Sequence, residues 1–158
     1  MSALATDIKK LLTQTSLVVF PEDYVAVYLP IGIRAIPGEW FRPDTTRFAV
    51  VIQEPELITM VLPRRKWMRM KNMFEKYKYD VSGPLKAITF DVRLSLVAGR
   101  FRVAIASALA EANIHSIPVS SFKRYHVIVP KADLPRTVKV LRGLIAHAKK
   151  KRAARAKK

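Results

Sequence analysis

Apolar positions along this chain recur first with a helical period, then with the short runs that are typical of strands. Leu4, Ile8, Leu11 and Leu12 have helical spacing, so a short entry helix is expected over residues 2–13. Runs rich in β-branched residues predict four strands, at residues 16–20, 24–29, 47–53 and 57–62. Glu54, Pro55 and Glu56 form the turn of a hairpin between the last two runs. Residues 30–43, which carry Trp40 and Phe41, are expected to form a Pro- and Gly-containing loop.

From Pro63 the pattern becomes helical. Trp67, Met70, Phe74 and Tyr77 recur at helical intervals, which predicts an amphipathic helix with these side chains in the core. Pro63 or the residue after it is expected to open this helix, because proline fits the first turn. The next interruption is the tripeptide at residues 82–84, Ser-Gly-Pro, which we interpret as an internal boundary.

The second half predicts strand, helix, strand, strand, helix. A strand is expected over residues 85–92, an alanine-rich helix over 101–112, and strands over 114–120 and 125–129. Asp133 and Pro135 are suited to the start of a final helix, whose apolar stripe stops after Ala148. This order predicts an antiparallel α+β fold with helices on one face. The expected parts are an N-terminal helix at 1–15, modules at 16–82 and 83–148, and a basic helical tail at 149–158.

Length and composition favour a compact protein. The chain has 158 residues, half of them hydrophobic, which is enough for one ordinary domain or two small fused modules. It has no cysteine, and no run approaches the roughly 20 apolar residues of a membrane-spanning helix. We therefore expect a cytoplasmic protein.

Positive charge is concentrated in the second half. Residues 1–82 hold 12 Lys and Arg against 9 Asp and Glu, whereas residues 83–158 hold 17 against 3, a net charge of +14. Seven of the last ten residues are cations, spaced by alanines that favour a helix. Such a field attracts polyanions and predicts a nucleic acid or an anionic surface as partner.

Catalytic motifs are not visible. His115, His126 and His147 are isolated and lack the spacing of metal ligands on one helix face. Five glycines form neither a dinucleotide fingerprint nor a phosphate-binding loop. We expect no enzyme, no metal and no cofactor. Asp91 is an isolated acid in the basic half, and the candidate ion-pair partners nearest in sequence are Arg93, Arg100 and Arg102.

Several short stretches resemble the ACT domain family, specifically the CASTOR-type tandem ACT proteins. These stretches follow the order of the family's motifs: Gly83-Pro84-Leu85, Leu109-Ala110-Glu111-Ala112-Asn113-Ile114, Ser120-Ser121 and Val127-Ile128-Val129-Pro130. Residues 48–61, with Glu56-Leu57, resemble part of the preceding half-module. The resemblance covers most of residues 16–145. It implies tandem ferredoxin-like βαββαβ units, pairing of such units in a homodimer, and the sensing of small ligands such as amino acids.

The resemblance also implies where a ligand would lie. The family's ligand sits at the turn before the first helix, which corresponds here to Val97, Ala98, Gly99 and Arg100, with Ser120 and Ser121 opposite. The family often has an acidic residue shortly after the serine pair, whereas this chain has Lys123, Arg124 and Tyr125 there. A ligand amine would therefore meet cations, and Arg100 favours a carboxylate or a phosphate.

The charge distribution leads us to favour RNA binding on this scaffold, with a ribosome-associated role. Basic side chains would neutralise phosphates and read the shape of structured RNA rather than its base sequence. The candidate contacts are Arg64, Arg65, Lys66, Arg69, Lys123, Arg124, Arg142, Lys149, Lys150, Lys151, Arg152, Arg155, Lys157 and Lys158. Trp40 and Phe122 could stack on bases, but we expect both to be packed. The alternative is a regulatory ACT protein that binds an amino acid or another small anion. A lipid-bound tail is less favoured, because the last turns have alanines rather than bulky apolar residues.

Overall fold

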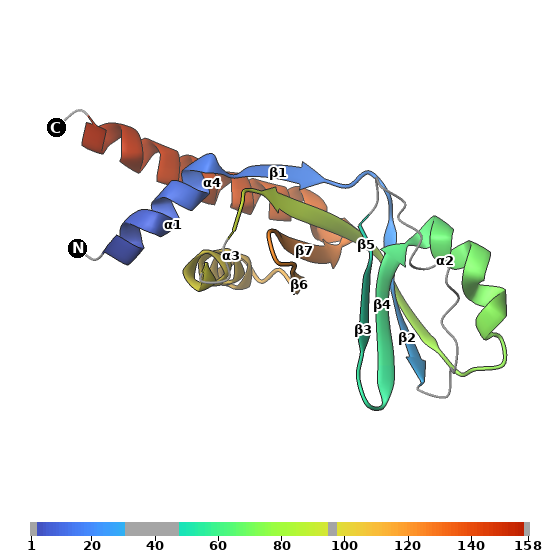
Figure 1. The fold of residues 1–158 in the computed structure, drawn as a ribbon. Coiled ribbons are helices and arrows are strands. Elements are labelled where there is room, and N and C mark those ends of the chain that lie inside the picture. The colour runs from blue at the N-terminus through green and yellow to red at the C-terminus, as the bar shows by residue number, and fades with distance from the viewer. Residues whose placement is uncertain (1–2, 31–47, 95–97, 157–158) are drawn as a thin grey trace. The chain divides into compact units, whose positions relative to one another are not determined.

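The computed structural model describes residues 3–30, 48–94 and 98–156, with side chains described from residue 8 to residue 150 of these ranges. The strands form a seven-stranded antiparallel sheet in the order β3-β4-β2-β5-β7-β6, with β1 also paired to β5 (Figure 1). The chain divides into two compact units. Residues 20–86 form the inserted unit, and residues 1–19 together with 87–158 form the split unit. The expected α+β fold is confirmed.

The split unit contains three helices and the strands β1, β5, β6 and β7. Its elements are α1 (Ala3–Gln14), β1 (Ser16–Val19), the second half of β5 (Asp80–Asp91), α3 (Gly99–Glu111), β6 (Ile117–Ser120), β7 (Tyr125–Pro130), a 3-10 turn (Lys131–Asp133) and α4 (Leu134–Ala156). The strand order β1-β5-β7-β6 is that of a ferredoxin-like βαββαβ unit. The strand that would normally end such a unit comes here from residues 16–19, which pair with residues 88–91.

The inserted unit has the same strand arrangement. Its elements are β2 (Tyr24–Pro30), β3 (Val50–Gln53), β4 (Leu57–Pro63), α2 (Arg64–Met70), a 3-10 helix (Lys71–Phe74) and the first half of β5. The hairpin expected between residues 47 and 62 is β3 and β4, closed by the Glu54 amide donating to the Leu57 carbonyl at 2.8 Å. The loop with Trp40 and Phe41 lies outside the described residues.

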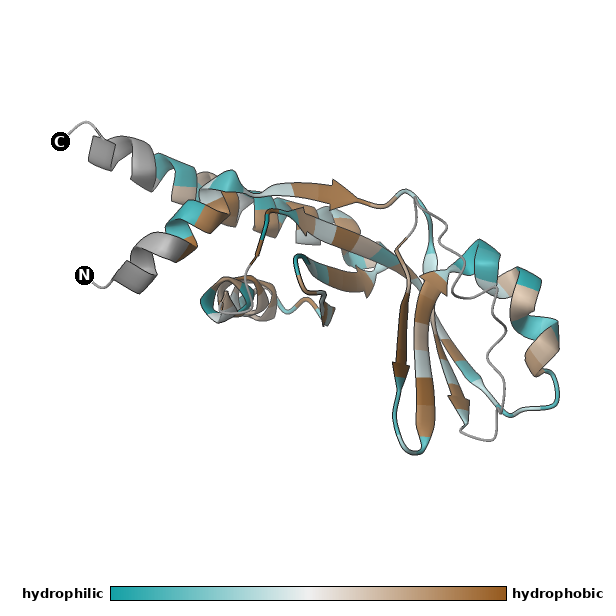
Figure 2. Ribbon diagram, in the orientation of Figure 1, coloured by the Kyte–Doolittle hydropathy of each residue, from teal (hydrophilic) through white to brown (hydrophobic). Residues whose placement is uncertain are grey.

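Each unit has a hydrophobic core of its own. In the split unit Phe90 of β5 packs edge-on to Phe101 of α3, and the two ring centroids are 5.8 Å apart. Leu141 of α4 is fully buried in the same cluster, and α1 lies beside α4 (Figure 1). In the inserted unit Trp67 stacks on Phe74 over the apolar face of β2 and β4. Figure 2 shows hydrophobic colour on strands of both units, including β1, β3 and β4, and mixed colours along α2.

The helix that starts after Pro63 is shorter than expected. Its α-helical part ends at Met70, and a 3-10 helix continues to Phe74. Trp67, Met70 and Phe74 are buried, as their spacing predicts. Tyr77 lies beyond the helix, where its amide donates to the Phe74 carbonyl at 2.8 Å, and its side chain is only partly buried.

The Ser-Gly-Pro stretch at residues 82–84 lies inside β5. Gly83 has a φ of 150°, and a Cβ there would come within 3.0 Å of the Tyr24 carbonyl oxygen. The pairing of β2 with β5 shifts register between Tyr24 and Ala26, directly opposite. This glycine is required by a close approach of two strands. The units divide within β5, between Lys86 and Ala87, and residues 16–19 belong with the later part of the chain.

The end of α3 shows the hydrogen bonds of a Schellman cap. The Asn113 amide donates to the Ala110 carbonyl at 2.8 Å, and the Ile114 amide donates to the Leu109 carbonyl at 2.9 Å. Asn113 has a φ of 52°, the left-handed conformation that such a cap needs. Buried Leu109 and Ile114 belong to one hydrophobic cluster, as is common for the motif.

Replacing Asn113 by glycine is expected to stabilise the protein, because glycine has no Cβ to disfavour the left-handed region. We expect Asn113→Gly to raise the free energy of unfolding by up to about 1 kcal/mol, and Asn113→Ala to lower it by a similar amount. Urea denaturation followed by circular dichroism measures both changes. Asn72→Gly, in the 3-10 helix after α2, is the control and should not stabilise. Equal effects of glycine and alanine at position 113 would contradict the cap.

Candidate functional site

One end of the split unit collects the segments that the ACT resemblance marks as a ligand site. Two cross-strand contacts, Thr89 with His126 and Asp91 with Arg124, show that β5 and β7 run in opposite directions. Because β6 is also antiparallel to β7, the carboxyl ends of β5 and β6 lie at the same edge of the sheet. The segment after β5 is tied to the β6–β7 turn there, since the Leu94 amide donates to the Lys123 carbonyl at 3.0 Å.

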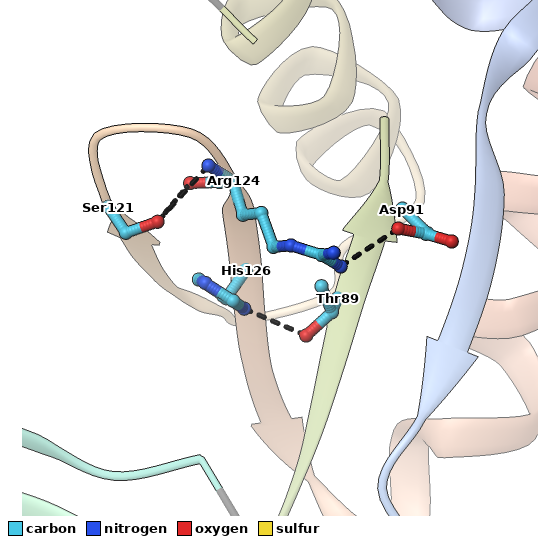
Figure 3. A network of polar contacts seen from close by, with 5 residues as sticks. All are labelled: Thr89, Asp91, Ser121, Arg124 and His126. Atoms are coloured by element: carbon cyan, nitrogen blue, oxygen red, sulfur yellow. Dashed lines mark hydrogen bonds and ion pairs between the residues drawn. The ribbon is translucent and has the colours of Figure 1, made fainter. Parts of the chain in front are cut away.

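The turn between β6 and β7 is closed by Ser121 and Arg124. The Ser121 amide donates to the Arg124 carbonyl at 2.9 Å, and the Arg124 amide donates to the Ser121 hydroxyl at 3.1 Å (Figure 3). The hydroxyl also lies 3.2 Å from the Arg124 carbonyl. Ser121 therefore shapes the turn, whereas Ser120 is an exposed residue at the end of β6.

Asp91 forms an ion pair with Arg124 rather than with any of the arginines nearest to it in sequence. One guanidinium nitrogen of Arg124 lies 2.8 Å from a carboxylate oxygen of Asp91, and both side chains are about half exposed (Figure 3). Arg93, Arg100 and Arg102 were the wrong candidates, because pairing of β5 with β7 places residue 124 across from residue 91. The pair occupies the carboxylate that could otherwise hold a ligand amine.

The first turn of α3 lies at the same end. Ala98 precedes the helix and is buried, and its methyl side chain gives no capping hydrogen bond. Gly99 and Arg100 are exposed in the first turn, which contains no acidic residue. Free amides at a helix start carry partial positive charge and favour an anion, and Arg100 adds a full charge. Val97, the remaining candidate of this set, lies outside the described residues.

Below the ion pair, β5 and β7 are joined by a buried polar contact. The Thr89 hydroxyl lies 2.8 Å from Nδ1 of His126, and both residues are buried (Figure 3). Their neighbours Phe90 and Tyr125 face the helices, so Thr89 and His126 face the other side of the sheet. Burial, and secondly the charge of Arg124, lower the pKa of His126 to about 4. The ring is neutral near pH 7.

The expected nucleic-acid contacts fall in both units. Arg64, Arg65 and Arg69 are exposed on α2 of the inserted unit, and Lys66 is partly exposed. Lys123 and Arg124 are exposed in the β6–β7 turn, next to Phe122, which is 69% exposed. The expectation that Phe122 is packed was therefore wrong, because the tight turn points its residues to solvent.

The last helix carries the largest set of cations. One face of α4 is buried through Thr137, Leu141, Ile145 and Ala148. Its exposed cations up to residue 150 are Arg136, Lys139, Arg142, Lys149 and Lys150. The helix contains no acidic residue and continues to Ala156, so Lys151, Arg152 and Arg155 belong to it, although their side chains lie outside the described set. Lys157 and Lys158 lie outside the described residues.

Other kinds of site find no support among the described residues. No group of three or more His, Cys, Asp and Glu side chains in that part of the chain is placed to hold a metal ion. No helix within the same residues has the length and the apolar character needed to cross a membrane.

Comparison with solved structures shows what the fold is similar to. A Vibrio cholerae protein of unknown function, described as a possible transport protein, superimposes with a TM-score of 0.65 at 20% identity over 90% of this chain and 99% of its own. Aspartokinase alpha and beta subunits give a TM-score of 0.64 at 13% identity, covering 84% of this chain and 98% of theirs. The regulatory subunit of aspartate kinase from Thermus thermophilus gives 0.59 at 10% identity, covering 82% and 97%. No protein-family model and no curated protein matches the sequence. At these sequence identities, the similarity to the solved structures shows a shared fold only.

The lowered pKa of His126 predicts a stability that depends on pH. Between about pH 6.5 and pH 4 the unfolded chain binds a proton at His126 and the folded protein does not, so stability falls as pH falls through this window. We expect a loss on the order of 2 kcal/mol, less than the full shift gives because water screens a partly buried ring. Urea denaturation at pH 7.5 and pH 4.5 measures it.

His126→Gln should remove most of this dependence. His147→Gln, at an exposed position of α4, is the matched control and should retain it. A His126→Gln variant that still loses as much stability as the parent protein would show that other groups cause the effect.

Proposed function

We propose that the split unit is a non-catalytic regulatory module of the ACT type, and that it binds a small anionic ligand at the start of α3. The observation that carries this proposal is electrostatic. Arg100 and the uncapped first turn of α3 lie at the same end of the unit as the exposed turn with Lys123. The one carboxylate that the structure places at this end, Asp91, is paired with Arg124.

The comparisons support the regulatory part of the proposal. Aspartate kinase regulatory subunits have this fold, and the match covers nearly their whole length, so both units take part in it. The sequence identity between those subunits and this chain is too low to identify the ligand of this chain. The residues of this chain favour a carboxylate or a phosphate over a zwitterion, because an ammonium group would approach Lys123 and a carboxylate that is already paired.

Ligand binding can be tested by thermal stabilisation. We expect succinate or inorganic phosphate to raise the melting temperature, and glycine, a zwitterion, to have little effect, since only binding to the folded state stabilises. Arg100→Gln should weaken binding by about tenfold or more, the usual cost of losing a charged hydrogen bond. Arg136→Gln, on α4, removes an equal charge elsewhere and should bind as the parent protein does. Equal losses in both variants would indicate unspecific charge attraction.

A second function, binding of structured RNA, is favoured by one feature of α4. The helix is 23 residues long and acid-free, and its exposed face has cations at the spacing of successive turns. Phosphate contacts of this kind release counterions and need no base-specific motif. Exposed Phe122 between Ser121 and Lys123 adds a surface on which a base could stack. This function rests on charge and exposure, since none of the descriptions of the similar structures mentions RNA.

Deletion of residues 149–158 tests the second function. In a titration of a labelled RNA stem-loop at about 0.1 M salt, we expect affinity to fall more than tenfold and to become less dependent on salt, because seven cations are lost. The triple variant Arg64→Gln, Arg65→Gln, Arg69→Gln removes the predicted contacts of the inserted unit but leaves α4 intact, and it should lower the affinity less than the deletion does. An unchanged affinity after the deletion would exclude α4 as the main contact.

A further inference from the structure

The inserted unit separates its charges onto two surfaces. Residues 64–78, which include α2 and the 3-10 helix after it, contain seven Lys and Arg and one acid. Residues 48–62, which include β3 and the turn into β4, contain two acids and no Lys or Arg. A chain that carries both signs on separate surfaces can bind a second copy of itself through them.

The basic surface has an apolar side chain at its centre. Arg65 and Arg69 stand one turn apart on α2, and Met68 lies beside them. All three side chains are exposed, Met68 at 50%, whereas Trp67 and Met70 fill the core face of the same helix. A methionine adapts its shape to a partner, and covering it contributes free energy that exposed ion pairs alone do not. We call Arg65, Met68 and Arg69 the α2 patch.

The hairpin of β3 and β4 carries the opposite charge where the chain turns. Glu54 and Glu56 are exposed on either side of Pro55. Val51 and Ile52, just before the turn, are 40% and 47% exposed. Since β3 is at the edge of the sheet, these two side chains border no further strand within the described residues. We call Val51, Ile52, Glu54 and Glu56 the hairpin tip.

The two surfaces do not neutralise each other within one chain. No ion pair among the described residues involves a glutamate of the hairpin tip or an arginine of the α2 patch. The turn lies at one end of β4 and α2 begins at the other end, and a strand of seven residues spans about 20 Å. Both sets of charges are therefore exposed to another molecule.

We propose that the hairpin tip of one chain binds the α2 patch of a second copy. The glutamates pair with the arginines, and the apolar side chains of the tip cover Met68. RNA phosphates would also be attracted by the two arginines, but they give no partner to an exposed methionine or to the acids of the hairpin. Because each chain carries one tip and one patch, two chains can form the contact twice. The inference does not depend on the small-anion site, which belongs to the split unit.

Charge reversal on each surface tests the proposal by sedimentation velocity of the nuclease-treated full chain at about 0.1 M salt. The tip variant is Glu54→Lys with Glu56→Lys, and the patch variant is Arg65→Glu with Arg69→Glu. Each should weaken self-association by about tenfold or more, because like charges then face each other. An equimolar mixture of the two variants should recover the association, since the reversed tip of one chain meets the reversed patch of the other.

Two further variants separate this contact from general charge effects and from RNA binding. Arg136→Glu with Lys139→Glu, at exposed positions of α4, is the matched control and should associate as the parent chain does. Met68→Ser should weaken self-association by about fivefold or more, since part of its apolar surface is no longer buried, and should leave the affinity for an RNA stem-loop unchanged.

Three results would overturn the proposal. The first is a nuclease-treated parent chain that remains monomeric at about 0.5 mM, a concentration at which weak contacts are populated. The second is association that survives in the tip variant or in the patch variant, which would place the contact between chains elsewhere. The third is a mixture of the two variants that does not associate, although circular dichroism shows both to be folded.

Discussion

The backbone of β5 is the constraint on which both units depend. Its twelve residues make the closing strand of the inserted unit with residues 80–86 and the first strand of the split unit with residues 87–91. The backbone amides and carbonyls of β5 must find hydrogen-bond partners in β2 along its first half and in β1 and β7 along its second half. The register shift opposite Gly83 lies in the first segment, where the strand needs a residue without a side chain. The alternation after it is strict, with Ile88 and Phe90 toward the helices and Thr89 away from them.

Local patterns predicted most elements, because they depend on residues close in sequence. The β3–β4 hairpin and the alanine-rich α3 have their signals in the spacing of their own side chains, and the structure has both. Contacts between residues far apart in sequence had no such local signal. Nothing near Ser16 indicates that its partner is Asp91, and nothing near Asp91 points to Arg124 rather than to Arg93. For the same reason the sequence around Gly83 did not show that this glycine lies inside a strand, where the backbone of β2 comes close to it.

The basic residues of the split unit fall into two groups, one in an ion pair at the end of the sheet and one exposed on α4. Arg124 is paired across two strands, and its charge also disfavours protonation of His126 beneath it. The cations of α4 stand on the solvent side of a helix whose other face is in the core. The ion pair of Arg124 with Asp91 links two strands at the end of the sheet where a small anion is proposed to bind. The second group leaves charges exposed to a much larger polyanion, so the cations of α4 are separate from the residues proposed to bind the small anion.

The contribution of residues 16–19 to the split unit has a consequence for biosynthesis. These residues leave the ribosome before their pairing partners, residues 88–91, which lie some seventy positions later in the chain. The inserted unit lies wholly between them, and its strands can pair as soon as residue 86 has emerged. Closing so long a loop is entropically costly and slow compared with forming a hairpin. During synthesis β1 must therefore wait unpaired, with the apolar side chains of Leu17 and Val19 uncovered, while the unit that follows it in sequence folds first.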